Sequence, residues 1–333
     1  MTLTVCWGAG WDSTAMLIEM HRRGIRPDLI TFADVGAEKP GTYRFLPLFS
    51  QWCRDHDFPD PTICVYQPKE VTTTRYRAGV EDVAARLGIT LDEQQIARLS
   101  RIYGNMVANE TLPGLAFGMK SCSLKWKVEA QEPPRCVSAP LVAAWDRGER
   151  VMKAIGFDCT EDHRTFADGK GMNISPCKGL PRYADRYSVW YPLRDWGLDR
   201  DACGRIITDA GLPLPPKSAC FFCPAMKPVE IELLRRDEPD CYALAIEMER
   251  LYRGGRHYRG DDTWTVAATH KITREKTSFD CTAASAAEAR QKFRYMMKDT
   301  ARPYQWNAAP SSAVPGLGRN FSWQDRELES IPE

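Results

Sequence analysis

The chain lacks a strong charge of either sign, because 45 Lys and Arg residues nearly balance 44 Asp and Glu residues and leave a net charge of +1. Such a balance argues against nucleic-acid binding through a bulk positive field, although it leaves room for a local basic groove. The chain also lacks an apolar run that approaches the length of about 20 residues needed to span a membrane. A core strand is expected within a few residues of Met1, where a secretory leader would stand. We therefore expect a cytoplasmic protein without a membrane partner.

Histidine is scarce, with 5 residues scattered outside any metal or triad spacing, so histidine-based nucleophilic catalysis is not expected. Cysteine, in contrast, occurs 12 times. Because disulfides are rare in a reducing compartment, we expect some cysteines to be buried apolar residues and others to be metal ligands. The cysteines expected to have a structural role are Cys6, Cys53, Cys64, Cys136, Cys159, Cys241 and Cys281.

The most informative segment lies at the start of the chain, where a short apolar strand runs into a glycine turn and then a helix. The first turn of a helix attracts anions through its unpaired N–H groups, and Gly8 and Gly10 allow a close approach because they have no Cβ. A dinucleotide fingerprint would need a third glycine at Ser13, and a Walker loop would need a Gly-Lys-Ser or Gly-Lys-Thr ending. The segment thus predicts a phosphate site of another kind, with an ordinary strand-to-helix turn as the alternative.

The first part of the chain alternates strand and helix signals, which predicts an α/β fold. This order favours a parallel sheet with right-handed crossovers, and ligands are expected at the carboxyl ends of its strands. Apolar residues at helical spacing over 79–110 indicate a helical insertion. The other expected elements are strands 3–7, 28–34, 62–66 and 151–157 and helices 13–23, 41–56 and 138–147.

Four segments carry a family resemblance. They are Gly8-Ala9-Gly10-Trp11-Asp12-Ser13-Thr14, Asp34-Val35-Gly36-Ala37-Glu38, Ser121-Cys122-Ser123-Leu124-Lys125-Trp126-Lys127, and the closing pair Tyr191-Pro192-Leu193-Arg194-Asp195-Trp196 and Lys217-Ser218-Ala219-Cys220-Phe221-Phe222-Cys223-Pro224. In this order they resemble the motifs of the PP-loop adenine nucleotide alpha-hydrolase superfamily, in its phosphoadenosine-phosphosulfate (PAPS) reductase branch. The resemblance covers residues 4–227 and includes similarity to DNA phosphorothioation and tRNA thiolation enzymes.

The resemblance implies a sheet of the HUP or Rossmann-like kind, sandwiched by helices, in a nucleotide-binding domain over residues 1–227. A small helical and mixed appendage is expected over 228–333. The implied ligand is ATP, or PAPS or its unphosphorylated analogue APS, with Mg²⁺. Asp12, Cys122 and Lys125 are implied as catalytic residues. The implied nucleotide-binding residues are Gly8, Ala9, Gly10, Trp11, Asp12, Ser13, Thr14, Asp34, Gly36, Glu38, Lys127, Gly156 and Arg164.

Two of these positions need comment. Arg164 is a candidate clamp for phosphate or sulfate, because a guanidinium binds an oxyanion through two donors, and a surface ion pair is the alternative. Gly8 stands where a typical PP-loop has a small hydroxyl residue, Trp11 where a basic residue is common, and Val35 where a threonine is usual. The first two changes remove side-chain contacts to phosphate.

Cysteine spacing adds a candidate metal site. Cys220-x-x-Cys223 allows two thiolates to reach one metal from a tight turn. The resemblance implies Cys122 as a third ligand, and the fourth is Cys203, Cys177 or absent. Three thiolates would suit a 4Fe-4S cluster with one open iron, while zinc and a metal-free site remain alternatives.

Three functions follow from these observations. The first is ATP-dependent adenylation followed by sulfur transfer, with AMP and pyrophosphate as products, a sulfur-donor protein such as a cysteine desulfurase as a partner, and a nucleic acid as one possible acceptor. The second is reduction of PAPS or APS, although the Glu-Cys-Gly-Leu-His run of those reductases is absent. The third is nucleotide binding or sensing with weak or no turnover, which the altered glycine turn favours.

Overall fold

The computed structural model describes the chain over residues 1–113, 121–133, 135–136, 138–160, 186–224, 226–254, 263–270, 276–282 and 304–310. The chain divides into two compact units, and each is described by itself. Unit 1 consists of Met1–Thr74, Ala97–Ile102 and Cys122–Cys220, and unit 2 of Arg75–Ile96, Tyr103–Ser121 and Phe221–Glu333. The helical segment expected as an insertion falls largely in unit 2. Arg164 lies outside the described residues.

A parallel sheet forms the centre of unit 1, as the alternating strand and helix signals predict. Its strands follow the order β3-β2-β1-β4-β5. The central register places Val5 beside Ile30 on one side and beside Ala154 on the other. The strands are β1 (Leu3–Cys6), β2 (Leu29–Ala33), β3 (Thr62–Cys64), β4 (Val151–Ile155) and β5 (Tyr187–Trp190).

This strand order creates a switch point. The chain builds outward from β1 through β2 to β3, and then returns to the other side of β1 to add β4 and β5. The connections on the two sides of the β1–β4 pair therefore leave in opposite directions. In open α/β sheets, ligands bind at the carboxyl ends of the strands beside such a point. The turn that follows β1 thus has the position that the sequence predicts for a ligand site.

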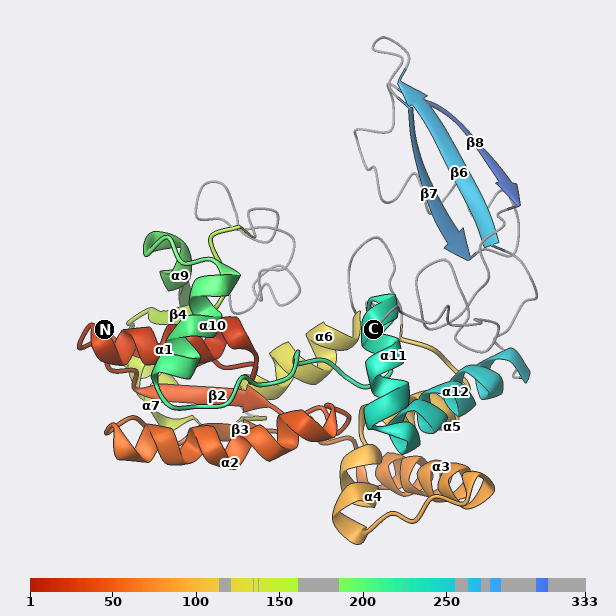
Figure 1. Cartoon of the computed structure of the whole chain (residues 1–333), viewed down its shortest axis with the longest axis horizontal. Coiled ribbons are helices and arrows are strands. Elements are labelled where there is room, and N and C mark those ends of the chain that lie inside the picture. The colour runs from red at the N-terminus through yellow and green to blue at the C-terminus, as the bar shows by residue number, and fades with distance from the viewer. Residues whose placement is uncertain are drawn as a thin grey trace. The chain divides into compact units, whose positions relative to one another are not determined.

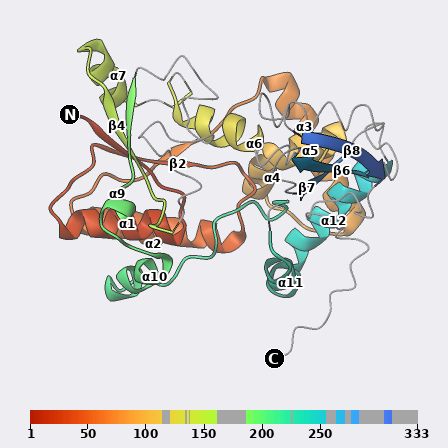
Figure 2. The same cartoon turned by 90° about the horizontal axis from the view of Figure 1, so that it is seen from above.

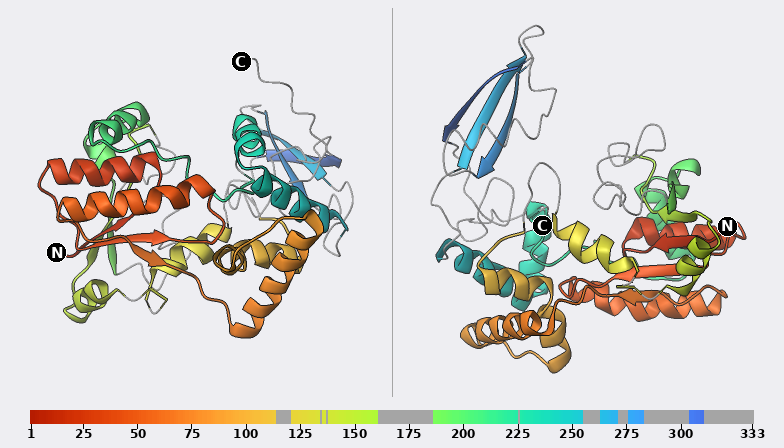
Figure 3. Two further views of the ribbon diagram at one scale, coloured as in Figure 1. Left: turned by 60° about the horizontal axis from the view of Figure 1, so that its bottom comes forward. Right: turned by 180° about the vertical axis from the view of Figure 1, so that it is seen from behind.

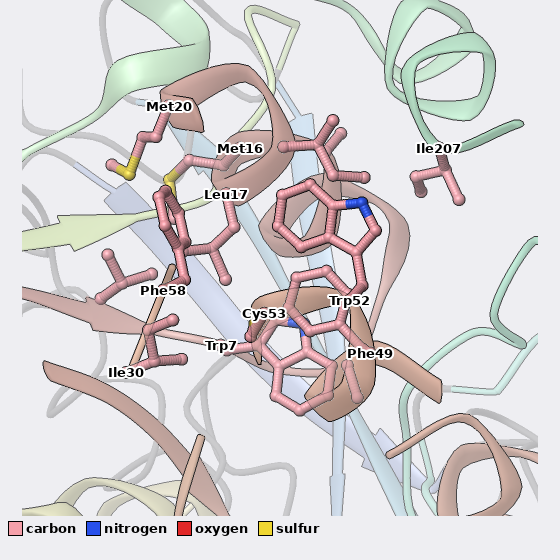
Figure 4. Packing of buried hydrophobic residues seen from close by; sticks show 14 of the residues in the cluster. Trp7, Met16, Leu17, Met20, Ile30, Phe49, Trp52, Cys53, Phe58 and Ile207 are labelled. Carbon is pink, nitrogen blue, oxygen red and sulfur yellow. The ribbon is translucent and has the colours of Figure 1, made fainter. Parts of the chain in front are cut away.

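Helices α1, α2 and α10 cover one face of this sheet and form its apolar core. Figure 3 shows α1 and α2 together on one side of the strands, with α7 on the other side, and α10 packs against α1 (Figure 1 and Figure 2). Trp7 stacks on Phe49, which stacks on Trp52, with ring centroids 4.7 and 5.4 Å apart (Figure 4). The helices are α1 (Trp11–Arg22), α2 (Pro40–Asp55), α7 (Ala139–Asp146), α9 (Pro192–Asp195) and α10 (Arg200–Asp209).

Local sequence explains where these helices begin and end. Pro40 occupies the first turn of α2, where its missing N–H and fixed φ cost nothing. Asp199 caps α10 by accepting a hydrogen bond from the N–H of Ala202 at 2.8 Å. Gly24, with φ of +67°, follows the end of α1, as the sequence predicts.

The other face of the sheet carries α7 and two short helical turns. Leu141 and Ala144 of α7 pack with Leu29, Val151 and Tyr187 of the sheet. The two turns contact β2. They are η1 (Leu124–Val128), which has π-helical geometry and follows α6 (Ser121–Ser123), and η2 (Glu129–Gln131), which is a 3₁₀ turn.

Unit 2 combines helices with a three-stranded antiparallel sheet of order β7-β6-β8 (Figure 1). The buried Tyr103 donates a hydrogen bond from its hydroxyl to the carbonyl of Leu244 at 2.9 Å, which ties α5 to α12. The helices are α3 (Glu70–Leu87), α4 (Glu93–Leu99), α5 (Ile102–Asn109), α11 (Pro228–Asp237) and α12 (Pro239–Gly254). Of these, α3, α4 and α5 each straddle the division between the units. The strands are β6 (Thr263–His270), β7 (Lys276–Thr282) and β8 (Tyr304–Pro310).

Within the described parts of both units, every helix is too short or too polar to cross a lipid bilayer.

Candidate functional site

The turn between β1 and α1 is strained in the way that functional turns often are. Ala9 has φ of +53° and is fully buried. A residue with a Cβ rarely adopts this left-handed conformation, which costs about 1–3 kcal/mol and is kept where the surroundings or a function require it. The strain lies between the two glycines that the sequence singles out for a close approach. It therefore falls at the point where a phosphate is expected.

Side chains of the first turn of α1 hold this loop in place. The N–H of Gly8 donates to the hydroxyl of Ser13 at 3.0 Å, and the indole N–H of Trp7 donates to the hydroxyl of Thr14 at 3.0 Å. Both hydroxyls thus serve the loop. The amides of the first helical turn have no acceptor within the helix, and they stand at the positive end of its dipole. The turn therefore offers backbone donors, with the hydroxyls of Ser13 and Thr14 in support.

The loop after β4 passes directly against this turn. A Cβ placed on Gly156 would lie 2.8 Å from both the nitrogen and the Cα of Ser13. Any larger residue would displace one of the two backbones. Gly156 is thus next to the predicted phosphate turn, and its small size explains why β4 can lie so close to the start of α1.

Asp12 and Trp11 face α10 and the segment after it. The carboxylate of Asp12 receives two contacts of 3.1 Å from the guanidinium of Arg200, which also lies over the Trp11 ring. The Trp11 indole donates to the carbonyl of Pro215 at 2.8 Å. Trp11 therefore anchors the 215–218 segment. Asp12 has a cation beside it before any ligand binds.

The loop after β2 is organised by Asp34. Its carboxylate accepts hydrogen bonds from the N–H of Gly36, the hydroxyl of Tyr43 and the guanidinium of Arg101, at 2.8, 2.8 and 2.6 Å. Burial and the Asp34 carboxylate raise the pKa of Tyr43, so its hydroxyl keeps its proton and remains a donor. Gly36 has φ of +82°, and a Cβ there would lie 2.0 Å from the carbonyl oxygen of Arg98. Asp34 thus shapes the loop that carries Glu38.

Glu38 is the meeting point of three predicted motifs. Its side chain is fully buried, and its Oε1 accepts from the ammonium of Lys127 at 2.9 Å. Its backbone forms an antiparallel bridge with Cys220. The second carboxylate oxygen, Oε2, makes no hydrogen bond to any described residue. A buried acceptor left without a donor costs about 1–3 kcal/mol, so a donor from a ligand would be stabilised here.

The segment before Cys220 connects this point to the β1–α1 turn. A Cβ on Gly10 would lie 3.6 Å from the Cβ of Ser218, and a Cβ on Gly41 would lie 3.0 Å from the ring of Pro216. Residues 215–220 therefore run past the starts of both α1 and α2. The structure brings together parts of all four segments that carry the family resemblance, within unit 1.

The cysteines predicted to bind a metal have different surroundings. Cys122 and Cys220 are half-buried members of unit 1, and Cys223 belongs to unit 2. Cys203 lies fully buried in the apolar core, where burial first and the charge of Asp12 second raise its pKa to about 12. Over the described ranges, no three His, Cys, Asp or Glu side chains are arranged to hold a metal ion. Cys177 lies outside those ranges.

Lys125, expected to be catalytic, lies near two aromatic rings. Its ammonium is 5.1 Å from the ring centroid of Tyr66 and 5.3 Å from that of Trp126. Such cation–π contacts hold the Lys125 side chain along the η1 turn. The contact that η1 makes with the β2–α2 loop comes instead from Lys127.

Sequence reasoning missed a buried polar network on the face of the sheet opposite the apolar core. The carboxylate of Glu132 accepts from the ammonium of Lys153 and from the hydroxyl of Tyr187, each at 2.5 Å. Thr31 of β2 donates to Gln131 at 2.6 Å. The only local signal was a lysine inside an otherwise apolar strand. This network fixes η2 to the sheet, and η2 directly follows the turn that carries Lys127.

Arg101 and Arg200 were also missed. Each is one of many arginines in the sequence, and each is paired with a predicted site residue that lies far away along the chain: Asp34 for Arg101 and Asp12 for Arg200. No spacing rule connects such pairs, so only the folded chain identifies them.

A scan against protein-family models, a search of curated proteins and a search of solved structures each gave no match to this chain.

Proposed function

We propose that unit 1 binds an adenine nucleotide at the carboxyl edge of its sheet, with the phosphates against the β1–α1 turn. Three features support this. The turn stands at the switch point of the strand order, it presents the first-turn amides of α1, and strain is kept at Ala9 between two glycines. The same features favour a sheet of the HUP or Rossmann-like kind that the PP-loop resemblance implies.

One observation carries the proposal, the convergence of distant segments around Gly10 and Glu38. Ser218 lies against Gly10, and both Lys127 and Cys220 meet Glu38. These contacts join residues of the segments that carry the family resemblance, and those segments lie far apart along the chain. A purely structural turn would not need these chemical groups in one place.

The reaction that suits this arrangement is adenylation followed by sulfur transfer. An oxygen of the acceptor attacks the α-phosphorus of ATP, and pyrophosphate leaves with the electrons of the broken bond. The outer sulfur of a cysteine persulfide then attacks the acceptor carbon, and AMP departs with its oxygen. A second thiol attacks the inner sulfur, the S–S bond breaks, the thiolated acceptor leaves, and the two thiols remain as a disulfide. Cys220, beside Glu38, and Cys122, on the turn before Lys127, are the candidate sulfur carriers, each loaded as a persulfide by a sulfur-donor protein.

Binding without turnover is the second candidate, and one observation favours it. Asp12 already faces the guanidinium of Arg200, and Trp11 is committed to Pro215. The charge of Asp12 is thus balanced by Arg200, and Trp11 carries no charge. A turn with these two residues is better suited to holding a nucleotide than to promoting its reaction. In this reading Arg200 contributes positive charge near the phosphates and the bound nucleotide is retained unchanged.

The test combines a binding measurement with product analysis on the full chain. Gly10→Ala fits the free protein, because the added Cβ would lie 3.6 Å from its nearest neighbour, yet it blocks the approach of a phosphate to the turn. We expect this variant to lose roughly tenfold or more of its affinity for ATP, measured by calorimetry, with little change in melting temperature. Gly79→Ala, the same change in α3 of unit 2, is the matched control and should bind like the parent.

The products separate the candidate functions. AMP and pyrophosphate released in the presence of an acceptor support sulfur transfer, whereas sulfite from PAPS or APS supports reduction. Tight binding of ATP that stays intact supports the binding protein. If the parent chain binds none of these nucleotides, or if Gly10→Ala binds ATP as well as the parent does, the proposed site is wrong.

A further inference from the structure

Two cysteine thiols that the proposed function does not use lie in contact inside unit 1. Cys64 ends β3, and Cys136 follows η2, yet their sulfur atoms are 2.9 Å apart although 72 positions separate them in the chain. Both residues are almost fully buried, with 2% and 3% of their surface exposed. A disulfide bond is about 2.05 Å long, so the two sulfurs stand within about 1 Å of bonding distance.

The backbone holds both cysteines firmly. The N–H of Asp34 donates to the carbonyl of Cys64 at 2.9 Å, which continues the pairing of β2 with β3. The N–H of Cys136 donates to the carbonyl of Glu132 at 3.1 Å, and the Glu132 side chain is anchored by Lys153 and Tyr187. Neither thiol therefore depends on a long mobile side chain to reach the other. Their proximity follows from how the segment after η2 is fixed to the sheet.

The two sulfurs share a hydrogen bond that either atom can donate. With Cys64 as the donor, this bond lowers the pKa of Cys136. Burial and the charge of Glu132 oppose that shift, and the charge of Lys153 supports it. The same hydrogen bond and burial raise the pKa of Cys64. Since the thiolate is the nucleophile, Cys136 is the thiol that reacts first, and Cys64 is positioned to react with the product.

We propose that Cys64 and Cys136 form a dithiol site that hydrogen peroxide oxidises to an intramolecular disulfide. The sulfur of Cys136 attacks one peroxide oxygen, the O–O bond breaks, and water leaves, which makes Cys136 a sulfenic acid. The sulfur of Cys64 then attacks the Cys136 sulfur, the S–O bond breaks, and a second water leaves with the Cys64 proton. Two thiols lose two electrons in all, and one hydrogen peroxide becomes two waters.

The bond would join two parts of unit 1 that meet at the candidate site. Cys64 is hydrogen-bonded through its backbone to Asp34, which shapes the loop that carries Glu38, and Cys136 follows the turns that carry Lys127. Oxidation closes a loop of about 72 residues and reduces the freedom of the unfolded chain. We expect the oxidised protein to melt at a higher temperature than the reduced protein. Neither the disulfide nor the higher melting temperature requires a bound nucleotide.

The experiment treats the fully reduced chain, without nucleotide, with hydrogen peroxide. Remaining thiols are then alkylated, and the digest is analysed by mass spectrometry without reduction. We expect a linked pair of peptides that contain Cys64 and Cys136, lighter than the separate peptides by two hydrogen atoms, which separates on reduction. Cys53 is the control within the same chain, because it is buried in the apolar core, where burial raises the pKa of its thiol to about 12. It should stay reduced during the peroxide treatment and therefore be found in the alkylated form.

A variant tests whether Cys136 is oxidised before Cys64 reacts with it. In Cys64→Ser the sulfenic acid on Cys136 has no partner thiol in contact, so a sulfenic-acid trap such as dimedone should label Cys136 severalfold more than it does in the parent protein. The proposal is overturned if the linked peptides are absent when exposed cysteines are already oxidised, if they form only after the chain is unfolded, or if Cys136 links mainly to another cysteine. Should Cys64→Ser fail to fold by circular dichroism, the peptide map of the parent decides alone.

Discussion

The two faces of the parallel sheet in unit 1 are covered in different ways. On one face, α1, α2 and α10 bury an apolar cluster that includes the Trp7, Phe49 and Trp52 stack (Figure 4). On the other face, Glu132 at the end of η2 is buried in contact with the Lys153 ammonium of β4 and the Tyr187 hydroxyl of β5. The apolar face tolerates many side-chain combinations of similar volume. The polar face is stable only if every buried polar group has a hydrogen-bond or ion-pair partner. It therefore specifies one arrangement of η1 and η2.

The largest expected effect comes from breaking the buried ion pair. Glu132→Ala leaves the Lys153 ammonium buried, with 5% of its side chain exposed, and removes the acceptor of the Tyr187 hydroxyl. We expect this variant to lose about 3–5 kcal/mol of unfolding free energy, measured by urea denaturation. The double variant Glu132→Leu with Lys153→Met removes both charges and should be more stable than the single variant. Equal losses in the two proteins would mean that the unpaired charge is not the cause.

An intermediate effect is expected in the pH dependence of the unfolding free energy, which should differ between a cysteine on the apolar face and one on the polar face. Burial raises the pKa of Cys53, on the apolar face, from its ordinary value of 9.0 to about 12. The folded protein therefore holds this proton while the unfolded chain loses it, so the stabilisation is complete below pH 9 and is lost as the pH rises from 9 to 12. Cys53→Ala should reduce the alkaline slope of stability by up to about 1.4 kcal/mol per pH unit, measured by urea denaturation between pH 8 and about 11.

Cys136, on the polar face, provides the contrasting variant. Its pKa is lowered in the folded protein by the hydrogen bond from Cys64, so its contribution is present above the pKa of the unfolded thiol and is lost as the pH falls. Cys136→Ala should therefore change the slope in the opposite direction. If both variants change the slope in the same direction, the two faces do not differ as described.

The smallest expected effect comes from an ion pair that is not buried. Arg54 and Asp60 approach to 2.8 Å, but about half of each side chain is exposed. Water already solvates both charges, so Asp60→Asn should change the unfolding free energy by less than about 1 kcal/mol. The measurement is the same urea denaturation that is used for Glu132→Ala. A loss as large as that of the buried pair would show that burial does not set the importance of these contacts.

Sequence patterns predicted the strands and helices of the apolar face well. Strand 28–34 and helix 41–56 correspond to β2 and α2, because alternating and helical periods are local properties of the chain. The glycine turn was found for the same reason, since it needs only adjacent residues. Patterns could not reveal that Lys127 would meet Glu38, 89 residues away, although both were named as nucleotide-binding residues.

The polar face was harder to predict. Lys153 sits in a strand whose other residues are mostly apolar, and Glu132 lies in an irregular segment after a short 3₁₀ turn. A single buried charge gives no period to detect. Cys64 and Cys136 were expected to be separate structural cysteines, because spacing motifs such as Cys-x-x-Cys recognise only pairs that are close along the chain.

The sequence by itself determined the alternating order of strand and helix and the glycine turn after β1, and it supplied the prediction of which residues contact a phosphate. The tertiary structure decided which of those residues meet: Ser218 with Gly10, Lys127 and Cys220 with Glu38, and the thiol of Cys64 with that of Cys136. The physical reason is that backbone geometry and hydrophobic period act over a few residues. Ion pairs, buried hydrogen bonds and thiol contacts form between segments that lie far apart in the sequence and meet only in the folded protein.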